Sequence, residues 1–244
     1  MNNQGKLSGH SFKHEVFRLL KAEDFDQALE DLCKFPPRRT INPLFLAFCS
    51  LDQQIRWRAV SATGAVVSCL AEKDMESARI VMRRIMWNLN DESGGIGWGM
   101  PEAMGEIMTR HEGLAREYAS ILVSYAQEDG NFLELEPLQR GVLWGLGRLA
   151  QVRPHLLQDA FPHVLRQLSS KDATLRGLAA WVIGLLGAGA ARDSLKALWK
   201  DEAELVLYLD GVLHSCRVSD LANAALTKIE QGGGDFSVDE GQKF

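Results

Sequence analysis

The sequence predicts an all-α protein, a right-handed α-α superhelix in which short helices stack in consecutive pairs. Apolar residues recur at three- and four-residue spacing in nearly every window from Ser11 to Glu230, whereas the alternation typical of strands is almost absent. Short polar, glycine or proline breaks separate these windows. A ten-residue motif also recurs along the chain, which is the signature of a repeat array.

The repeated motif ends in a glycine. Its copies occupy residues 55–64, 96–105, 138–147 and 175–184, and their terminal glycines lie 41, 42 and 37 residues apart. One helix pair with its turns has about this length. Glycine inside a helix costs about 1 kcal/mol relative to alanine, so a glycine at the same place in every copy indicates a neighbouring helix packed closely against it.

The breaks place the elements in order along the chain. We expect a flexible N-terminus at 1–10, an N-terminal helical cap at 11–50, an array of about five helix pairs at 51–230 and a flexible tail at 231–244. The cap helices are predicted at 11–21, 24–34 and 42–50. The pairs are predicted at 52–71 with 74–89, 99–110 with 113–128, 136–152 with 154–169, 172–187 with 190–200, and 203–216 with 218–230.

Composition narrows the function classes. The 244 residues include 27 Lys and Arg against 32 Asp and Glu, a formal net charge of −5, which argues against a broad phosphate-binding surface. The chain lacks a CxxC motif, a secretory signal pattern and an apolar run of the roughly 20 residues that a membrane helix needs. We therefore expect a cytoplasmic protein with buried, reduced cysteines, and neither nucleic acid nor membrane as its partner.

The motif resembles the HEAT-like repeat superfamily, including the phycobilin-lyase-type repeats. The resemblance lies in Ile55-Arg56-x-x-Ala59-x-x-Ala62-x-Gly64 and in Leu175-Arg176-x-x-Ala179-Ala180-x-x-x-Gly184, and the repeats cover about residues 50–230. Two further runs, 87–106 and 136–145, are similar to an uncharacterised HEAT-repeat family from anaerobic bacteria. The resemblance implies the solenoid fold; it implies no particular activity, because such arrays serve many functions.

The segment 88–102 is the least ordinary part of the chain. Four glycines in six residues lie beside two acids, before a helix that begins near Met100. Glycine lets a partner approach the backbone closely, so a binding loop is one interpretation; an elongated turn whose acids cap helix ends is the other. The candidate partner-binding residues here are Asp91, Glu92, Gly94, Gly95, Trp98 and Glu102.

Tryptophans and arginines extend this candidate surface. Trp57 and Trp98 share one aligned position, and Trp144 and Trp181 share the position four residues later. Stacked repeats would bring them into a row, which either lines a groove or forms a buried seam between helices. Arg140 lies on the same helix as Trp144, where arginines form either a basic ridge or ion pairs with residues such as Asp52 and Asp172.

The sequence favours a non-catalytic scaffold or adaptor that binds a protein partner near the glycine-rich loop. The alternative is an enzyme or cofactor-handling protein with a small-molecule pocket at that loop. No nucleophile motif is present, and no cofactor is predicted. His14-Glu15 and His111-Glu112 resemble the iron-binding pairs of deoxyhypusine hydroxylase, but they occupy non-equivalent positions, so no metal site is predicted either.

Overall fold

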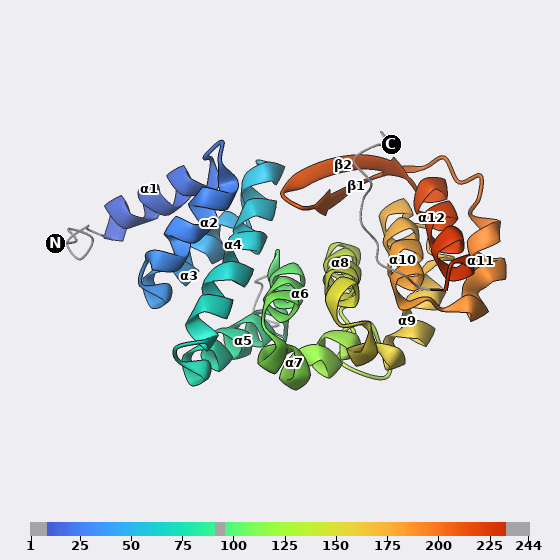
Figure 1. Ribbon diagram of the computed structural model, residues 1–244, viewed down its shortest axis with the longest axis horizontal. Helices are drawn as coiled ribbons and strands as arrows, with labels where there is room; N and C mark the ends of the chain where they lie inside the picture. Colours follow the sequence, from blue (N-terminus) through green and yellow to red (C-terminus); the bar gives the residue numbers. More distant parts are fainter. Residues whose placement is uncertain (1–8, 91–95, 233–244) are drawn as a thin grey trace. The chain divides into compact units, whose positions relative to one another are not determined.

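The computed structural model describes residues 9–90 and 96–232 and divides the chain into two compact units, Met1–His111 and Glu112–Phe244. The described residues are helical apart from one two-stranded sheet and the turns (Figure 1). The predicted all-α class is confirmed. Most of the predicted flexible segments, 1–10 and 231–244, lie outside the described residues.

The helices and strands follow one another in this order. Unit 1 comprises α1 (Gly9–Leu20), α2 (Phe25–Lys34), α3 (Pro37–Ala47), α4 (Gln53–Ala71), α5 (Met75–Asn90) and α6 (Met100–Arg110). Unit 2 comprises α7 (Glu112–Ser124), α8 (Glu136–Val152), α9 (Phe161–Gln167), α10 (Ala173–Leu186), α11 (Arg192–Ala197), β1 (Glu204–Leu209), β2 (Val212–Arg217) and α12 (Val218–Glu230). Three short 3-10 turns also lie in unit 2, at η2 (Pro154–Leu156), η3 (Gln158–Ala160) and η4 (Gly189–Ala191).

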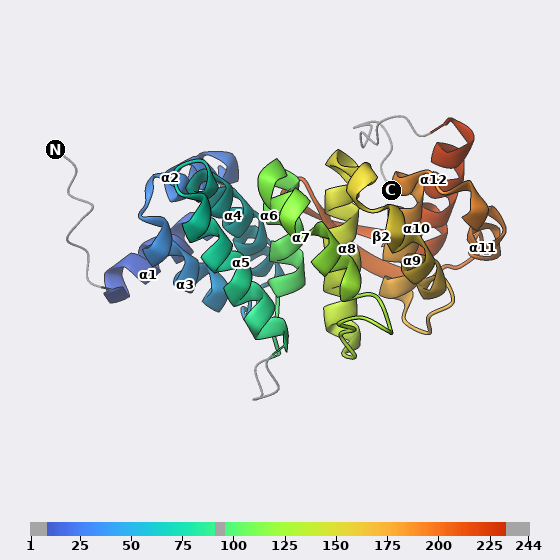
Figure 2. The same cartoon turned by 90° about the horizontal axis from the view of Figure 1, so that it is seen from below.

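Helix α4 is the centre of unit 1. It begins at Asp52, whose carboxylate accepts hydrogen bonds from the backbone N–H groups of Gln54 and Ile55. It contacts α1, α2, α3, α5 and α6, and α5 lies beside it in both views (Figures 1 and 2). Every residue from Ala59 to Val67 is buried, so α4 is packed on more than one side, as a helix inside a repeat stack must be.

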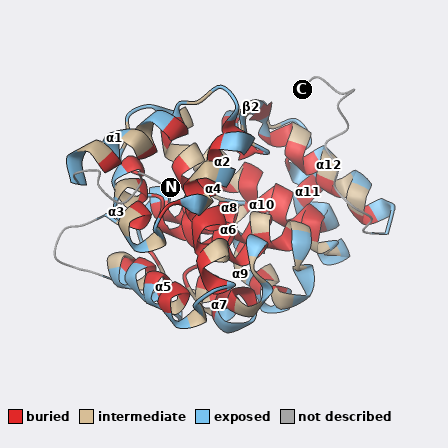
Figure 3. Ribbon diagram, turned by 60° about the vertical axis from the view of Figure 1, so that its left-hand side comes forward, coloured by how far each residue is buried: buried red, intermediate tan, exposed pale blue. Residues whose placement is uncertain are grey.

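Helix α10 has the same role in unit 2. Asp172 caps its start by accepting from the Leu175 N–H, and Gly187 ends it with a left-handed φ of 64°. The helix contacts α8, α9, α12 and β1. Figure 3 shows burial along most of its length, in agreement with ten buried residues between Leu175 and Leu185.

The helix predicted over 203–216 is wrong: this segment is the antiparallel hairpin β1–β2. Asp210 and Gly211 form its two-residue turn with φ angles of 48° and 84°, and Leu209 pairs with Val212. Positive φ at both turn positions matches the right-handed twist of the strands and favours Asp-Gly. Leu205 and Leu207 are buried, and Leu205 lies against Gly177 of α10.

Two other expectations need correction. Helix α3 begins at Pro37 instead of residue 42, because proline suits the first turn of a helix, where its missing N–H would have no partner. The helix predicted at 154–169 is split into two 3-10 turns and a short α-helix, and the one predicted at 190–200 into one 3-10 turn and a short α-helix.

Candidate functional site

The motif glycines lie where neighbouring helices approach each other most closely. A Cβ on Gly64 would be 2.5 Å from Cγ of Glu106 in α6, and one on Gly184 would be 2.8 Å from Cα of Ala225 in α12. A Cβ on Gly147 would overlap the indole ring of Trp181. Three of the four motif glycines thus face another helix at a distance that no side chain allows, as the recurring glycine predicts.

The candidate binding residues are divided between the two units. Trp98 and Glu102 belong to unit 1, whereas Arg140, Trp144 and Trp181 belong to unit 2. Asp91, Glu92, Gly94 and Gly95 lie outside the described residues. Of the five candidates that the structure describes, Trp98 and Glu102 thus lie at the start of α6, and the other three lie on the neighbouring helices α8 and α10.

The two candidate tryptophans of unit 2 are part of its core. Trp144 and Trp181 are each 2% exposed, so neither lines the surface that the predicted row requires. The indole N–H of Trp144 donates to the Tyr208 carbonyl oxygen at 2.9 Å, which ties α8 to strand β1. The ring of Trp181 fills the space beside Gly147. The interpretation as a buried seam between helices describes both side chains.

Arg140 and the other arginines of the motif hold helix ends together. Arg140 forms an ion pair with Asp172, the cap of α10, and Arg176 forms one with Asp201 at 2.7 Å. Arg58 donates to the carbonyl oxygens of Leu20 and Ala22 at 3.2 and 2.6 Å. Arg140 and Arg176 thus form ion pairs with acidic side chains, which was one of the two predicted roles. The guanidinium groups of these two arginines do not form an open basic ridge.

The backbone before α6 rests on the ends of two other helices. Gly97 and Gly99 have φ angles of 39° and 72°, which L-residues with a side chain rarely adopt. A Cβ on Gly97 would lie 3.0 Å from the Asn88 carbonyl oxygen, and one on Gly99 would lie 2.6 Å from Cγ of Phe48. The glycines of the motif's second copy therefore let the chain pass close to the ends of α3 and α5.

Large apolar side chains are exposed around this crossing. Trp98 is 39% exposed and Trp87, at the end of α5, is 73% exposed. Ile96 and Leu51, in the turn before α4, are exposed as well. We call these four residues the apolar end of unit 1: Leu51, Trp87, Ile96 and Trp98. Leu51, Trp87 and Ile96 were not among the predicted binding residues; for Leu51 and Ile96, a large apolar residue in a turn was a signal.

Glu102 lies one turn into α6, next to the apolar end. Its side chain is half-buried, and its Oε2 atom is inaccessible to solvent and has no hydrogen-bond partner among the described residues. Burial raises the pKa of the Glu102 carboxyl to about 7, while the positive charge of Arg56 opposes the shift. This carboxyl therefore changes its charge near neutral pH. One turn later, the buried Glu106 pairs with Arg110, four residues on, at 2.8 Å.

Within residues 9–90 and 96–232, three or more His, Cys, Asp or Glu side chains nowhere come together as a metal site would require. None of the helices in this part of the chain is both long enough and apolar enough to cross a bilayer.

Comparisons with known proteins agree with this architecture. Residues 136–186 match the model of the HEAT-like repeat. An uncharacterised protein of Archaeoglobus fulgidus is 28% identical over 169 residues, which cover 66% of this chain and 80% of that protein.

Solved structures give the same result. An engineered protein superimposes with a TM-score of 0.51 and 17% identity over 91% of this chain and 98% of its own. A second engineered protein superimposes with a TM-score of 0.51 and 14% identity, over 95% of this chain and 100% of its own. The chain thus has the all-α superhelical fold of HEAT- and armadillo-type repeats.

Proposed function

We propose that the protein is a non-catalytic interaction scaffold that binds a segment of a partner protein at the apolar end of unit 1. Repeat arrays of this kind present extended binding surfaces, which is their common use. The observation that carries the proposal is the exposure of Trp87 and Trp98 on adjoining segments of one unit. Clustered exposed apolar side chains on a soluble fold are typical of an interaction site.

The chemistry of the site favours a partner with a large apolar anchor. Tryptophan combines a wide apolar surface with one N–H donor and is enriched among the residues that dominate binding energy. Glu102 and Arg56 supply charges at the edge of the apolar end, where polar groups fix orientation more than affinity. A partner that places a cation near Glu102 would bind more tightly above pH 7, where the carboxyl is ionised.

The position of each predicted binding residue in the structure decides whether it belongs to the proposed site. Trp98 and Glu102 remain in it, joined by Leu51, Trp87 and Ile96. Asp91, Glu92, Gly94 and Gly95 remain through their place in the sequence beside Ile96. Arg140, Trp144 and Trp181 leave it, because they hold the core of unit 2 together. The finer resemblance, to phycobilin-lyase-type repeats and to the family from anaerobic bacteria, stays a prediction.

The test is a comparison of partner capture by one double variant and one single-substitution control. Trp87→Ala/Trp98→Ala removes both exposed indoles of the apolar end, whereas the control Trp199→Ala removes an exposed indole of unit 2. Both are checked for folding by urea denaturation. Proteins retained from the native cell extract are identified by mass spectrometry, and the purified partner is then titrated against each variant.

We expect the double variant to bind the purified partner at least about tenfold more weakly, the loss that truncating one hot-spot residue causes. The Trp199→Ala control should bind as the wild type does. Equal binding by the wild type and the double variant would contradict the proposed surface, and so would the absence of any retained protein.

A small-molecule site at the same place is the second candidate. The observation that favours it is Glu102, because a half-buried carboxyl that titrates near pH 7 is suited to proton transfer. Native mass spectrometry distinguishes the two functions. A reproducible extra mass on the wild type that Glu102→Gln lacks would support a small-molecule site, and the bare polypeptide mass would support the scaffold.

A further inference from the structure

A groove of about 400 Å³ lies between α1 and α3 in unit 1. Residues Gly9, Phe12, Lys13, Arg38, Arg39, Asn42, Pro43 and Leu46 line it. None of them belongs to the apolar end. The groove is therefore a second, separate surface feature of the unit, formed by helices that the sequence predicts only as a cap.

The lining combines positive charge with apolar surface. Lys13 comes from α1, and Arg38 and Arg39 come from the first turn of α3. The apolar part is made by Phe12, Pro43 and Leu46, and none of the described lining residues is acidic. Three cations at one place stand out in a chain whose formal net charge is −5. Such a lining complements an anion attached to an apolar group.

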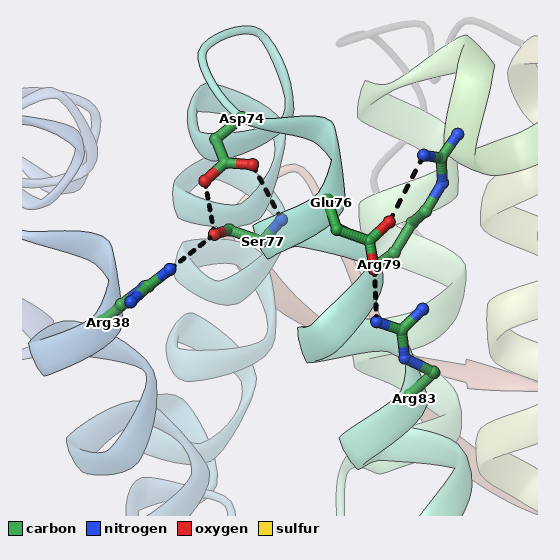
Figure 4. A network of polar contacts seen from close by, with 6 residues as sticks. All are labelled: Arg38, Asp74, Glu76, Ser77, Arg79 and Arg83. Atoms are coloured by element: carbon green, nitrogen blue, oxygen red, sulfur yellow. Dashed lines mark hydrogen bonds and ion pairs between the residues drawn. The ribbon is translucent and has the colours of Figure 1, made fainter.

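Contacts with α5 hold the α3 side of the groove in place. Arg38 Nη2 donates to Ser77 Oγ at 3.1 Å, and Ser77 donates in turn to Asp74 Oδ2 at 2.5 Å (Figure 4). Asn42 Oδ1 accepts from Arg84 Nη2 at 2.8 Å. Since the Asn42 oxygen is engaged, its N–H groups are the atoms that it can offer to a ligand, and they are donors, as an anion requires.

The remaining two cations lie over aromatic rings. The Arg39 guanidinium is 4.5 Å from the centre of the Phe12 ring, and Lys13 Nζ is 5.8 Å from that of Phe17. A ring face does not neutralise a charge as a carboxylate does, so these two ring contacts remove no positive charge from the groove. The charge of Arg38 also acts on the Asp74 carboxylate. The nearby acid Glu76 pairs with Arg79 and Arg83 on its own helix (Figure 4).

We propose that this groove binds an acidic segment of a partner protein, in which a carboxylate side chain is followed by an apolar one. The carboxylate lies between Lys13 and the two arginines, and the apolar side chain packs on Pro43 and Leu46, beside the buried Phe12. Lys13, Arg38, Asn42 and Leu46 are exposed, so the groove is open along one side. An open groove fits an extended chain better than a small molecule, which proteins usually enclose.

The test uses the full chain and two pools of fluorescent peptides, N-acetylated and C-amidated. One pool has the fixed core Asp-Glu-Leu-Phe between random residues, and the other has the matched neutral core Asn-Gln-Leu-Phe. Binding is measured by anisotropy at low and at moderate salt. We expect saturable binding of the acidic pool, at least about tenfold weaker binding of the neutral pool, and a loss of affinity as salt screens the charges.

Three variants assign the binding to the groove. Lys13→Gln/Arg39→Gln should weaken binding of the acidic pool at least about tenfold, the usual cost of removing charges that contact a ligand. Lys21→Gln/Lys73→Gln removes two exposed charges of the same unit outside the groove and should bind as the wild type does. Leu46→Asp adds an acid at the exposed rim of the groove and should abolish binding without disturbing the core.

Several results would overturn the proposal. Equal affinity for the acidic and neutral pools would do so, as would equal losses in the two lysine-containing double variants. Saturable binding of inorganic phosphate or acetate in the absence of any peptide binding would reduce the groove to a simple anion site. Trp87→Ala/Trp98→Ala should bind the acidic pool normally, so this outcome separates the groove from the apolar end.

Discussion

The indole ring of Trp181 in α10 lies directly against the backbone of Gly147 in α8, in the space that a side chain at residue 147 would occupy. The contact joins the motif glycine of one repeat to a tryptophan of the next. The motif glycine gives up side-chain burial and helix propensity, and in return the bulkiest side chain of the next repeat packs fully between the helices. The pair explains why one copy of the motif needs glycine at its last position.

Replacing Gly147 with alanine should destabilise unit 2. The new methyl group overlaps the Trp181 ring, and overpacking costs about 1–3 kcal/mol, which exceeds the roughly 1 kcal/mol gained from helix propensity. Gly189→Ala is the matched control, because the nearest atom to its Cβ is 3.8 Å away. Urea denaturation of both variants gives the free energy of unfolding. A Gly147→Ala protein as stable as the control would show that the contact is not tight.

Asp172→Asn should destabilise the protein by about 1–2 kcal/mol at neutral pH, through loss of the ion pair with Arg140 and of the negative charge at the N-terminus of α10. Burial alone would raise the pKa of Asp172, but the hydrogen bonds from Arg140 and Leu175 outweigh it and hold the pKa below 3.8. The ionised carboxylate therefore stabilises the fold above pH 3.8, and this contribution is lost as the pH falls through the lower, folded pKa.

The measurement is urea denaturation of the wild type and the variant at pH 7 and at the lowest pH where the wild type stays folded. The difference between them should shrink at low pH. Asp193→Asn, at a fully exposed position in α11, should behave as the wild type at both pH values. A constant difference across the pH range would mean that the carboxylate charge does not contribute.

Glu102→Gln should remove a loss of stability that the wild type shows as the pH rises through 7. The folded pKa of Glu102 is about 7 against a usual 4.5, so the folded state binds its proton more tightly than the unfolded chain does. Wild-type stability therefore falls as the pH rises from 4.5 through 7, by up to about 3 kcal/mol. Glutamine stays neutral and avoids this cost. The variant should gain stability over the wild type at pH 8 relative to pH 4.

The same urea experiment, repeated across this pH range, measures the effect. Glu23→Gln changes an exposed acid on the same unit and should track the wild type at every pH. If the Glu102→Gln curve also runs parallel to that of the wild type, the Glu102 carboxyl titrates with its ordinary pKa and is well solvated.

The four cysteines should react with iodoacetamide at very different rates. Burial, together with a hydrogen bond to the Cys69 thiol, raises the pKa of Cys33 to about 12, and burial raises that of Cys216 to about 11. Thiolates are the reactive species, so both residues react slowly at pH 8. Cys49 is exposed and should be labelled first, which corrects the expectation of four buried thiols. Peptide mass spectrometry over time gives the order; uniform labelling would contradict it.

Much of the fold could be predicted from apolar spacing and punctuation. Helices α8 and α12 begin and end at the predicted residues. Pro137 and the break at Arg153-Pro154 mark α8, and Asp220 lies in the first turn of α12, where an acid is favoured. The hairpin was missed although the short apolar run from Leu205 to Leu209, which includes Val206 and Tyr208, leads directly into Asp210-Gly211. Because the segments before and after 203–216 have helical spacing, a helix was predicted there as well. Only the Asp210-Gly211 turn indicated a hairpin.

The site could be predicted far less well, because helical spacing shows which residues share a stripe and not what covers it. Trp98 and Trp144 lie on the same stripe of the aligned motif, yet the first is exposed and the second is buried beneath Tyr208. The α1–α3 groove was missed for a related reason. Lys13 and Arg39 are 26 positions apart, so only the packing of two helices brings them to one groove.

The bond from Trp144 to Tyr208 also bears on how the chain is made. A ribosome releases α8 long before strand β1, which follows 64 residues later, so the indole N–H has no carbonyl to meet during that interval. Unit 1 has all its residues in place by then, whereas the largest side chain of α8 is still uncovered. Unit 2 can therefore complete its core only after the hairpin has emerged from the ribosome. We expect chaperones to bind nascent chains that stop before residue 208 more strongly than complete chains.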